Sequence, residues 1–233
     1  MSISRKYGRT YHFPFSPGTT SDDRINTAYW DSVSQLQTVI HTEKLDGENN
    51  CLSQYGVFAR SHAAPTVSPW TRAIRERWEL IKNDLGDYEL FGENLYAVHS
   101  IRYTDLPEHF YIFGVREHDR WLSWEETVFI ASCFDFPTVP VLKTVTDLSD
   151  RSAFESELLA LVQEPSVFGS VDVHSGSPCS MEGVVTRNVG EYPVAAFAEN
   201  VFKYVRKGHV KTDEHWIRNW KRARLKHEGH VED

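Results

Sequence analysis

Hydrophobic and polar positions divide the chain into many short strands and a few helices. The clearest helical spacing follows Ser68-Pro69, which suit an N-cap and a first helical turn, and apolar residues then recur on one face as far as Leu85. Ser123 and Glu126 have the spacing of a capping box. The pattern therefore predicts helices in four segments: from 69 to 85, from 123 to 134, 153–163 and 214–227.

The other apolar segments have the length and aromatic or β-branched content of strands. They are one segment ending near Lys44, and then 50–55, 57–60, 88–96, 110–117, 181–187 and 195–206. Such a mixture of strands with segregated helices predicts an α+β fold of mainly antiparallel sheets flanked by helices. No repeat or linker interrupts it, so we expect a single domain over 1–233, with an irregular arm over 1–25 and a basic helix within 210–233.

The composition indicates a soluble globular protein. The 233 residues are enough to bury a full core, and 40% of them are hydrophobic. No segment has the length of apolar sequence that spans a bilayer, and the amino-terminal residues lack the apolar core of a secretory signal. The three cysteines lie far apart, which favours free thiols in a cytoplasmic protein over a disulfide framework or a zinc site.

Charge is distributed unevenly along the chain. The formal net charge is −8, which argues against a general nucleic-acid binder. The segment 200–227 nevertheless carries nine Lys or Arg residues against Asp213 and Glu214, so it is +7 and the remainder is −15. A basic segment on an acidic body is compatible with a polyanion bound at one site, and equally with a solvated basic helix.

The string Lys44-Leu45-Asp46-Gly47 places a lysine at the end of a strand, just before a turn. Asp-Gly is a good turn pair, so the string alone is typical of a surface turn. The same spacing occurs where a lysine attacks the α-phosphate of a nucleotide. That reaction needs a neutral amine, and because a free lysine has a pKa of about 10.4, the site has to lower this pKa through burial or nearby positive charge.

Two glutamates interrupt apolar strand segments. Glu93 lies within 88–96 and Glu182 within 181–187, each next to a glycine. A charged side chain in a buried strand costs free energy unless it is paired or functional, so both are candidate site residues. Their hard carboxylate oxygens suit Mg²⁺ or Mn²⁺.

Five more polar or aromatic residues are candidates, each with a plainer explanation. Arg60 ends a strand, where its guanidinium could bind phosphate or simply face solvent. Lys203 lies in the last strand segment, and Phe113 in an aromatic run that a core position explains as well. Glu43 and Asn49, on either side of the turn, are also typical of ordinary polar strand residues.

The order and spacing of these segments resemble the nucleotidyl transferase motifs of the covalent polynucleotide ligases and capping enzymes. The resemblance is closest to the ATP-dependent RNA ligase 2 family, and it covers about residues 37 to 212. It implies a nucleotidyl transferase domain with an ATP-grasp-like fold. It also implies an enzyme that uses ATP and Mg²⁺ or Mn²⁺ to join RNA 5′-phosphate and 3′-hydroxyl ends.

The resemblance assigns catalytic roles to three residues. Lys44 would be the nucleophile that takes up AMP. Glu182 would bind the divalent metal, and Lys203 would contact the α-phosphate. The metal would neutralise charge on the α-phosphate and on the leaving pyrophosphate.

The resemblance also assigns residues to the nucleotide. Glu43 would accept from the adenine amino group, as carboxylates do from the amino groups of bases, and Phe113 would stack on adenine. Glu93 would contact the ribose hydroxyl or metal-bound water, and Arg60 the ribose or a phosphate. Asn49 matches an asparagine that RNA ligase 2 enzymes carry in the same place.

The chain departs from the family pattern in two places. Family members usually carry two lysines one residue apart in the last motif, whereas Val201 and Val205 flank Lys203 at that spacing, which leaves Arg206 or Lys207 as the second cation. Only about 30 residues follow Lys203, too few for the OB-fold of DNA ligases and capping enzymes. We therefore expect a minimal domain in which the basic carboxyl-terminal segment recognises the RNA.

Three other functions stay open. A small ATP-dependent DNA ligase would use the same residues. A GTP-using capping enzyme is disfavoured by Glu43 and by the missing OB-fold. A nucleotide or RNA-end binding module without sealing activity is favoured by the basic segment and opposed by Glu93 and Glu182. The sequence leaves open whether an end-healing kinase or phosphatase is a partner.

Overall fold

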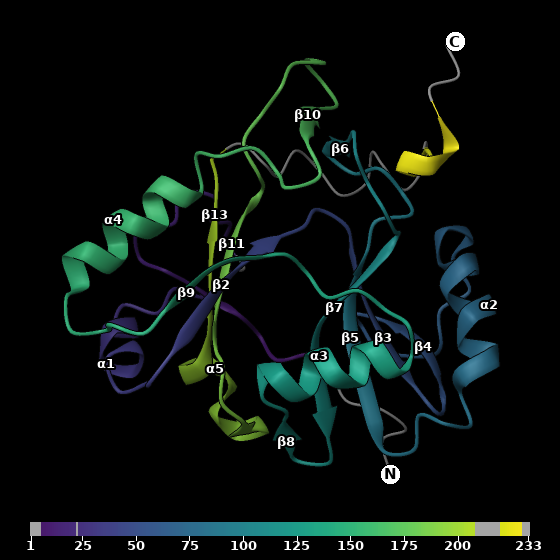
Figure 1. Ribbon diagram of the computed structural model, residues 1–233, viewed down its shortest axis with the longest axis horizontal. Coiled ribbons are helices and arrows are strands. Elements are labelled where there is room, and N and C mark those ends of the chain that lie inside the picture. Colours follow the sequence, from purple (N-terminus) through teal and green to yellow (C-terminus); the bar gives the residue numbers. More distant parts are fainter. Residues whose placement is uncertain (1–5, 22, 208–219, 230–233) are drawn as a thin grey trace.

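The computed structural model describes residues 6–21, 23–207 and 220–229, and most of its strands form two large sheets that face each other (Figure 1). The five-stranded sheet contains, in spatial order, β1 (Tyr11–His12), β13 (Val201–Val205), β11 (Gly183–Asn188), β2 (Val39–Lys44) and β9 (Val141–Val145). The six-stranded sheet contains β12 (Tyr192–Pro193), β8 (Arg120–Trp121), β7 (Phe110–Glu117), β5 (Tyr88–Asn94), β3 (Glu48–Ser53) and β4 (Gly56–Ala59). A separate pair joins β10 (Ser170–Asp172) to β6 (Ile101–Tyr103).

Helices cover the outer face of each sheet (Figure 1). The five-stranded sheet is covered by α1 (Tyr29–Val33) and α4 (Arg151–Leu161), and the six-stranded sheet by α2 (Arg72–Ile81) and α3 (Trp124–Cys133). The short helix α5 (Phe197–Asn200) leads directly into β13. The 3₁₀ turns are Pro69–Thr71, Val194–Ala196 and Lys226–Glu228.

Strand alternation produces three hydrophobic cores. Along β7, Phe110 and Ile112 pack toward α3, whereas Tyr111 and Phe113 point into the space between the sheets. The core under α1 and α4 is equally aromatic, and Phe13 of the amino-terminal arm is fully buried in it. Both sheets therefore have two covered faces, and the space between the sheets forms a middle layer.

The chain passes from one sheet to the other at the turn Leu45-Asp46-Gly47, between β2 and β3. Asp46 anchors this turn, because its Oδ2 accepts hydrogen bonds from the Ser100 and Ile101 amides at 2.8 and 2.7 Å. Gly47 is required by close packing, since a Cβ there would lie 2.5 Å from the Asn94 carbonyl oxygen. The turn that the sequence predicts is thus fixed from both sides.

The observed elements confirm the α+β fold class with mainly antiparallel sheets. The helices α2 and α3 lie within their predicted segments, and α4 overlaps the predicted segment 153–163 but begins two residues earlier. The prediction of one strand over 195–206 is wrong at its amino-terminal half, which forms a 3₁₀ turn and α5 before β13. The arm is less irregular than expected, because it contributes β1. The helix expected over 214–227 is not formed in its described part, where 220–225 is extended and only Lys226–Glu228 is helical. Residues 208–219 lie outside the described residues.

The helices within the described ranges are too short or too polar to serve as a membrane-spanning segment.

Candidate active site

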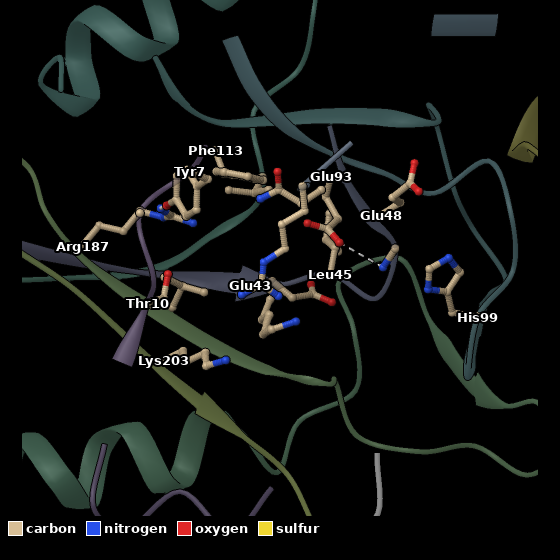
Figure 2. Close-up of a pocket in the computed structure, with 17 residues that line it drawn as sticks. Tyr7, Thr10, Glu43, Leu45, Glu48, Glu93, His99, Phe113, Arg187 and Lys203 are labelled. Atoms are coloured by element: carbon tan, nitrogen blue, oxygen red, sulfur yellow. Dashed lines mark hydrogen bonds between the residues drawn. The ribbon is translucent and has the colours of Figure 1, made fainter. Parts of the chain in front are cut away.

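A cavity of about 380 Å³ opens between the two sheets, around the end of β2 (Figure 2). Seven of the residues that the sequence predicts for the site line it: Glu43, Lys44, Asn49, Arg60, Glu93, Phe113 and Lys203. The eighth, Glu182, is joined to the site by its contact with Lys44. The structure therefore brings together residues that are separated by up to 160 positions in the chain.

The Lys44 amine is held by a carboxylate. Its Nζ donates to Glu182 Oε1 at 2.5 Å. Burial lowers the pKa of Lys44, but Glu182, Glu93 and Asp46 together raise it above its ordinary value. The sequence analysis expects the site to lower this pKa, and the structure differs because carboxylates surround the amine. Lys44 is thus an ammonium that has to lose a proton before it can act as a nucleophile.

Glu182 is positioned by the pairing of β11 with β2. Gly183, its neighbour, is the register partner of Lys44, so the Glu182 side chain emerges where β2 ends. A Cβ on Gly183 would lie 1.9 Å from the Tyr204 carbonyl oxygen, which means that only glycine lets β11 approach β13 here. In the Glu182-Gly183 pair, the glycine therefore allows the close approach of two strands, and this approach positions the Glu182 carboxylate.

Glu93 lies on β5 and faces the same amine from the other sheet. Its Oε1 accepts a hydrogen bond from the Gly47 amide at 3.2 Å, which is the dashed line in Figure 2. Burial, together with Glu182 and Asp46, raises the pKa of Glu93 to about 8, although Lys44 acts in the opposite direction. The three carboxyl groups of Glu93, Glu182 and Asp46 therefore surround one amine, and Lys44 alone does not balance their negative charge.

The donor chemistry of Glu93 and Glu182 fits a divalent cation. Both are carboxyl groups with hard oxygens, and both act on Lys44. Among the described residues no group of three or more His, Cys, Asp or Glu side chains could hold a metal ion. A cation here would therefore complete its coordination with water or with substrate phosphates, as Mg²⁺ commonly does.

Two polar atoms near the cavity have no hydrogen-bond partner within the described ranges, namely Glu43 Oε1 and Asn49 Oδ1. Glu43 is only 1% exposed, and its Oε2 accepts from the Val167 amide at 3.0 Å. Burial raises the pKa of Glu43 to about 7, against the hydrogen bonds from Ser166 and Val167. Both free oxygens are available to donors of a ligand.

Phe113 faces the cavity at the position of a β-bulge. The register of β5 against β7 passes from Gly114 directly to Ile112, so Phe113 is the extra residue on β7. Tyr7 packs edge-on against its ring at a centroid distance of 5.0 Å, and the Arg187 guanidinium lies 5.3 Å from the ring centroid. In Figure 2 these three residues occupy one end of the cavity, and His99 lies at the opposite end.

The two predicted cations differ in environment. Arg60, beyond the end of β4, is exposed. Lys203 on β13 is 16% exposed, and its Nζ lies 3.1 Å from Asp23 Oδ1. Asp23 belongs to the amino-terminal arm, to which the sequence analysis gives no role.

Sequence reasoning missed several further residues that line the cavity, among them Tyr7, Thr10, Glu48, His99 and Arg187. Strand alternation could have identified Arg187, since it lies four residues after Gly183 on β11 and faces the same side. Its Nη1 donates to the Tyr7 hydroxyl at 3.0 Å and its Nε to Thr42 Oγ1 at 3.2 Å. The arm residues Tyr7 and Thr10 carry no pattern that points to a site.

Comparison with known proteins gives a family match. A family model described as RNA ligase matches residues 37–205, which extend from just before β2 to the end of β13. A search of curated protein sequences returned no match.

Solved structures with a similar fold include an archaeal ATP-dependent RNA ligase, at 17% identity and a TM-score of 0.52, over 87% of this chain and 48% of that one. A Naegleria gruberi RNA ligase with pyrophosphate is 17% identical, with a TM-score of 0.53, over 91% and 63% of the two chains. A mutant of that ligase with ATP and Mn is 16% identical, with a TM-score of 0.52, over 88% and 61%. The chain thus spans about half to two thirds of these structures, and the likeness is one of fold.

Proposed function

Since the chain belongs to the RNA ligase family, we propose that it joins RNA ends in an ATP-dependent reaction through a covalent lysyl-AMP intermediate. Its substrates would be an RNA 5′-phosphate and an RNA 3′-hydroxyl. The placement of Lys44 supports this most directly, because its amine lies in the cavity beside Glu182 and Glu93. An amine that can be deprotonated in such a cavity is what covalent nucleotidyl transfer requires.

The reaction would proceed in three steps. Lys44 Nζ loses a proton and attacks the α-phosphorus of ATP, the bond to the β-phosphate oxygen breaks, and pyrophosphate leaves. An oxygen of the RNA 5′-phosphate then attacks the same phosphorus, which frees Lys44 and leaves AMP on the RNA end. Finally the 3′-hydroxyl attacks the 5′-phosphorus, loses its proton, forms the phosphodiester and releases AMP.

Positioning and charge neutralisation would carry most of the catalysis. Lys203 and Arg60 line the cavity and would contact phosphate oxygens. Glu182 holds Lys44 Nζ before the nucleotide arrives. Glu182 and Glu93 would hold Mg²⁺ or Mn²⁺, which when bound neutralises charge on the α-phosphate and the pyrophosphate.

The adenine would bind at the Phe113 end of the cavity. Phe113 offers a ring for stacking, a contact worth about 1–3 kcal/mol per base. Glu43 Oε1, which has no partner among the described residues, would accept from the adenine amino group. Asn49 Oδ1 is a further acceptor without a partner in the described part of the chain.

Replacing Glu43 with glutamine should weaken nucleotide selectivity while stabilising the fold. The carboxyl pKa is about 7 in the folded protein and 4.5 in the reference state. Ionisation of Glu43 therefore lowers the free energy of unfolding progressively between pH 4.5 and pH 7, and the loss stays constant above pH 7. Neutral glutamine avoids this cost, which is about 3 kcal/mol for a difference of this size. Urea unfolding at pH 8 should show E43Q to be the more stable protein.

The same variant should lose preference for ATP over GTP by about 10- to 100-fold, because an amide can donate to guanine O6 where the carboxylate cannot. Labelling with each nucleotide measures this. At pH 4.5 the stability difference between E43Q and the wild type should disappear. A variant that is less stable at pH 8, or that keeps its ATP preference, contradicts the assignment.

The carboxyl-terminal segment 220–229 would contact the RNA. The Ala223 amide donates to the Tyr96 carbonyl at 2.8 Å and the Val98 amide to the Lys221 carbonyl at 2.9 Å, which fixes the segment next to the loop that carries His99. Lys221 is exposed there. Because both sheets line one cavity, we also propose that the two sheets form a single nucleotidyl transferase domain.

The deciding experiment incubates the protein with α-labelled ATP and Mg²⁺ or Mn²⁺, and then adds a nicked duplex with a 5′-phosphate. An acid-labile protein label that passes to the RNA 5′-end and is released as AMP while the nick is sealed supports the proposal. No protein label would refute it. Sealing only when DNA supplies the 3′-hydroxyl side would favour a DNA ligase, and a label that never leaves the protein would favour a binding module.

A further inference from the structure

The amino-terminal arm reaches the phosphate side of the cavity. Its strand β1 pairs in parallel with β13, in a register that places His12 beside Lys203. The following segment returns along β1, where the His12 amide donates to the Arg24 carbonyl at 2.7 Å and the Asn26 amide to the His12 carbonyl at 2.9 Å. This return brings Asp23 next to both side chains. All of these arm residues precede the matched family region, which begins at 37.

A continuous set of polar contacts runs from Val205 of β13 through three arm residues and back to Lys203 of the same strand. The Val205 amide donates to Ser16 Oγ at 2.9 Å, and Ser16 Oγ lies 2.8 Å from His12 Nδ1. His12 Nε2 lies 3.1 Å from Asp23 Oδ1, and Lys203 Nζ lies 3.1 Å from that same oxygen. The contacts begin and end on one strand, two residues apart.

The burial of these groups argues against an incidental surface pair. His12 is 1% exposed, and the side chains of Asp23 and Lys203 are 23% and 16% exposed. Polar groups buried to this degree cost free energy unless their contacts are satisfied. The arm therefore uses buried polar groups to hold Lys203 in the cavity.

Charges on several elements act on Lys203. Burial lowers its pKa, and Lys44 on β2 and Arg60 beyond β4 lower it further, whereas Asp23 raises it. Burial, with Lys203, lowers the pKa of His12 to about 4, so this histidine is neutral at pH 7, with Nε2 facing Asp23 and Nδ1 facing Ser16. Asp23 is thus the group that opposes loss of the Lys203 proton.

We propose that Asp23, oriented by His12, is a positioning residue that keeps Lys203 a cation aimed at the nucleotide phosphates. This rests on the proposed function, in which Lys203 contacts the α-phosphate. It explains how one lysine can serve where Val201 and Val205 occupy the positions of a second. The contact is supplied by the arm, so the matched family region would hold an incomplete site.

The test follows Lys203 directly. Protein labelled with ¹³C at lysine Cε is titrated by NMR as wild type and as Asp23→Asn, and the Lys203 signal is assigned with Lys203→Arg. Loss of an opposite charge at this distance should lower the pKa of Lys203 by at least about one unit. His12→Gln should give a smaller shift, and Asp31→Asn, an exposed residue of α1, should give none. An unshifted Lys203 signal in D23N overturns the proposal.

Adenylylation of Lys44 gives the second readout. In D23N the alkaline loss of labelling should move to lower pH by the same amount as the Lys203 pKa, an effect that simple destabilisation would not produce. Thermal unfolding identifies variants that fail to fold. Wild-type labelling at every pH in D23N overturns the proposal and leaves the proposed function intact. If the wild type itself does not label, the proposed function fails, while the titration still decides whether Asp23 holds Lys203.

Discussion

Lys44→Ala and Lys44→Arg are both expected to abolish covalent labelling by α-labelled ATP. The alanine variant has no amine. The arginine variant keeps the positive charge but cannot be deprotonated near neutral pH, so it offers no lone pair to the α-phosphorus. The loss should be complete, because the proposed covalent bond forms on Lys44 Nζ itself. Autoradiography of denatured protein after incubation with labelled ATP measures it.

The three-step scheme allows a sharper control. An RNA whose 5′-end already carries AMP needs only the last step, which does not form a bond to Lys44. Lys44→Ala should therefore still seal this activated RNA although it cannot use ATP. Lys82→Ala, which removes a half-buried lysine just after the end of α2, should label normally. Labelling that persists in either Lys44 variant would show that another residue is the nucleophile.

The residues that the sequence predicts for the centre of the candidate site lie together in the structure, because their motifs combine polar side chains with packing. In Lys44-Leu45-Asp46-Gly47, the Asp46 carboxylate anchors the turn and Gly47 allows contact with the Asn94 backbone. In Glu182-Gly183, the glycine lets β11 approach β13 while the glutamate reaches Lys44. A pattern that satisfies two requirements at once leaves few alternatives, and it is recognisable without a structure.

Other parts of the site depend on tertiary contacts that leave no local pattern. Phe113 lies at a bulge of β7, which the aromatic run around it does not indicate. Asp23 and Tyr7 come from an arm whose composition indicates an irregular segment. Asp23 reaches Lys203 because β1 pairs with β13 and the following segment returns along β1. The sequence also does not indicate that Lys44 is protonated, since its pKa is raised by Glu182, Glu93 and Asp46, which lie far apart in the chain or in different elements.

The terminal segment illustrates the limit of periodicity. Its basic residues and tryptophans predict a helix within 214–227, yet the described part from 220 lies extended along the loop after β5. Backbone hydrogen bonds to Tyr96 and Val98 replace those of a helix there, and Trp220 packs against Tyr96 at a centroid distance of 6.0 Å. Tertiary pairing has overridden the local preference.

Glu182→Gln distinguishes two proposed roles of Glu182, which are to restrain Lys44 and to hold the divalent cation. The two roles predict opposite effects on the rate of adenylylation. If the carboxylate only restrained Lys44, its removal would ease deprotonation of the amine and speed up adenylylation. If it also holds the divalent cation beside the α-phosphate, the variant should be slower, by about 10²- to 10³-fold, as for the loss of one preorganised electrostatic contact. We expect the second result, measured as single-turnover labelling of Lys44.

The metal dependence should distinguish this loss from a general defect. A site that keeps only Glu93 binds the cation more weakly, so Glu182→Gln should need more Mg²⁺ for half-maximal labelling, and part of the lost rate should return at high Mg²⁺. Glu79→Gln, which alters an exposed glutamate of α2, should leave both the rate and the Mg²⁺ requirement unchanged. A faster Glu182→Gln enzyme with an unchanged Mg²⁺ requirement would limit Glu182 to restraining Lys44, and the cation would then have to be held by Glu93 with the substrate phosphates.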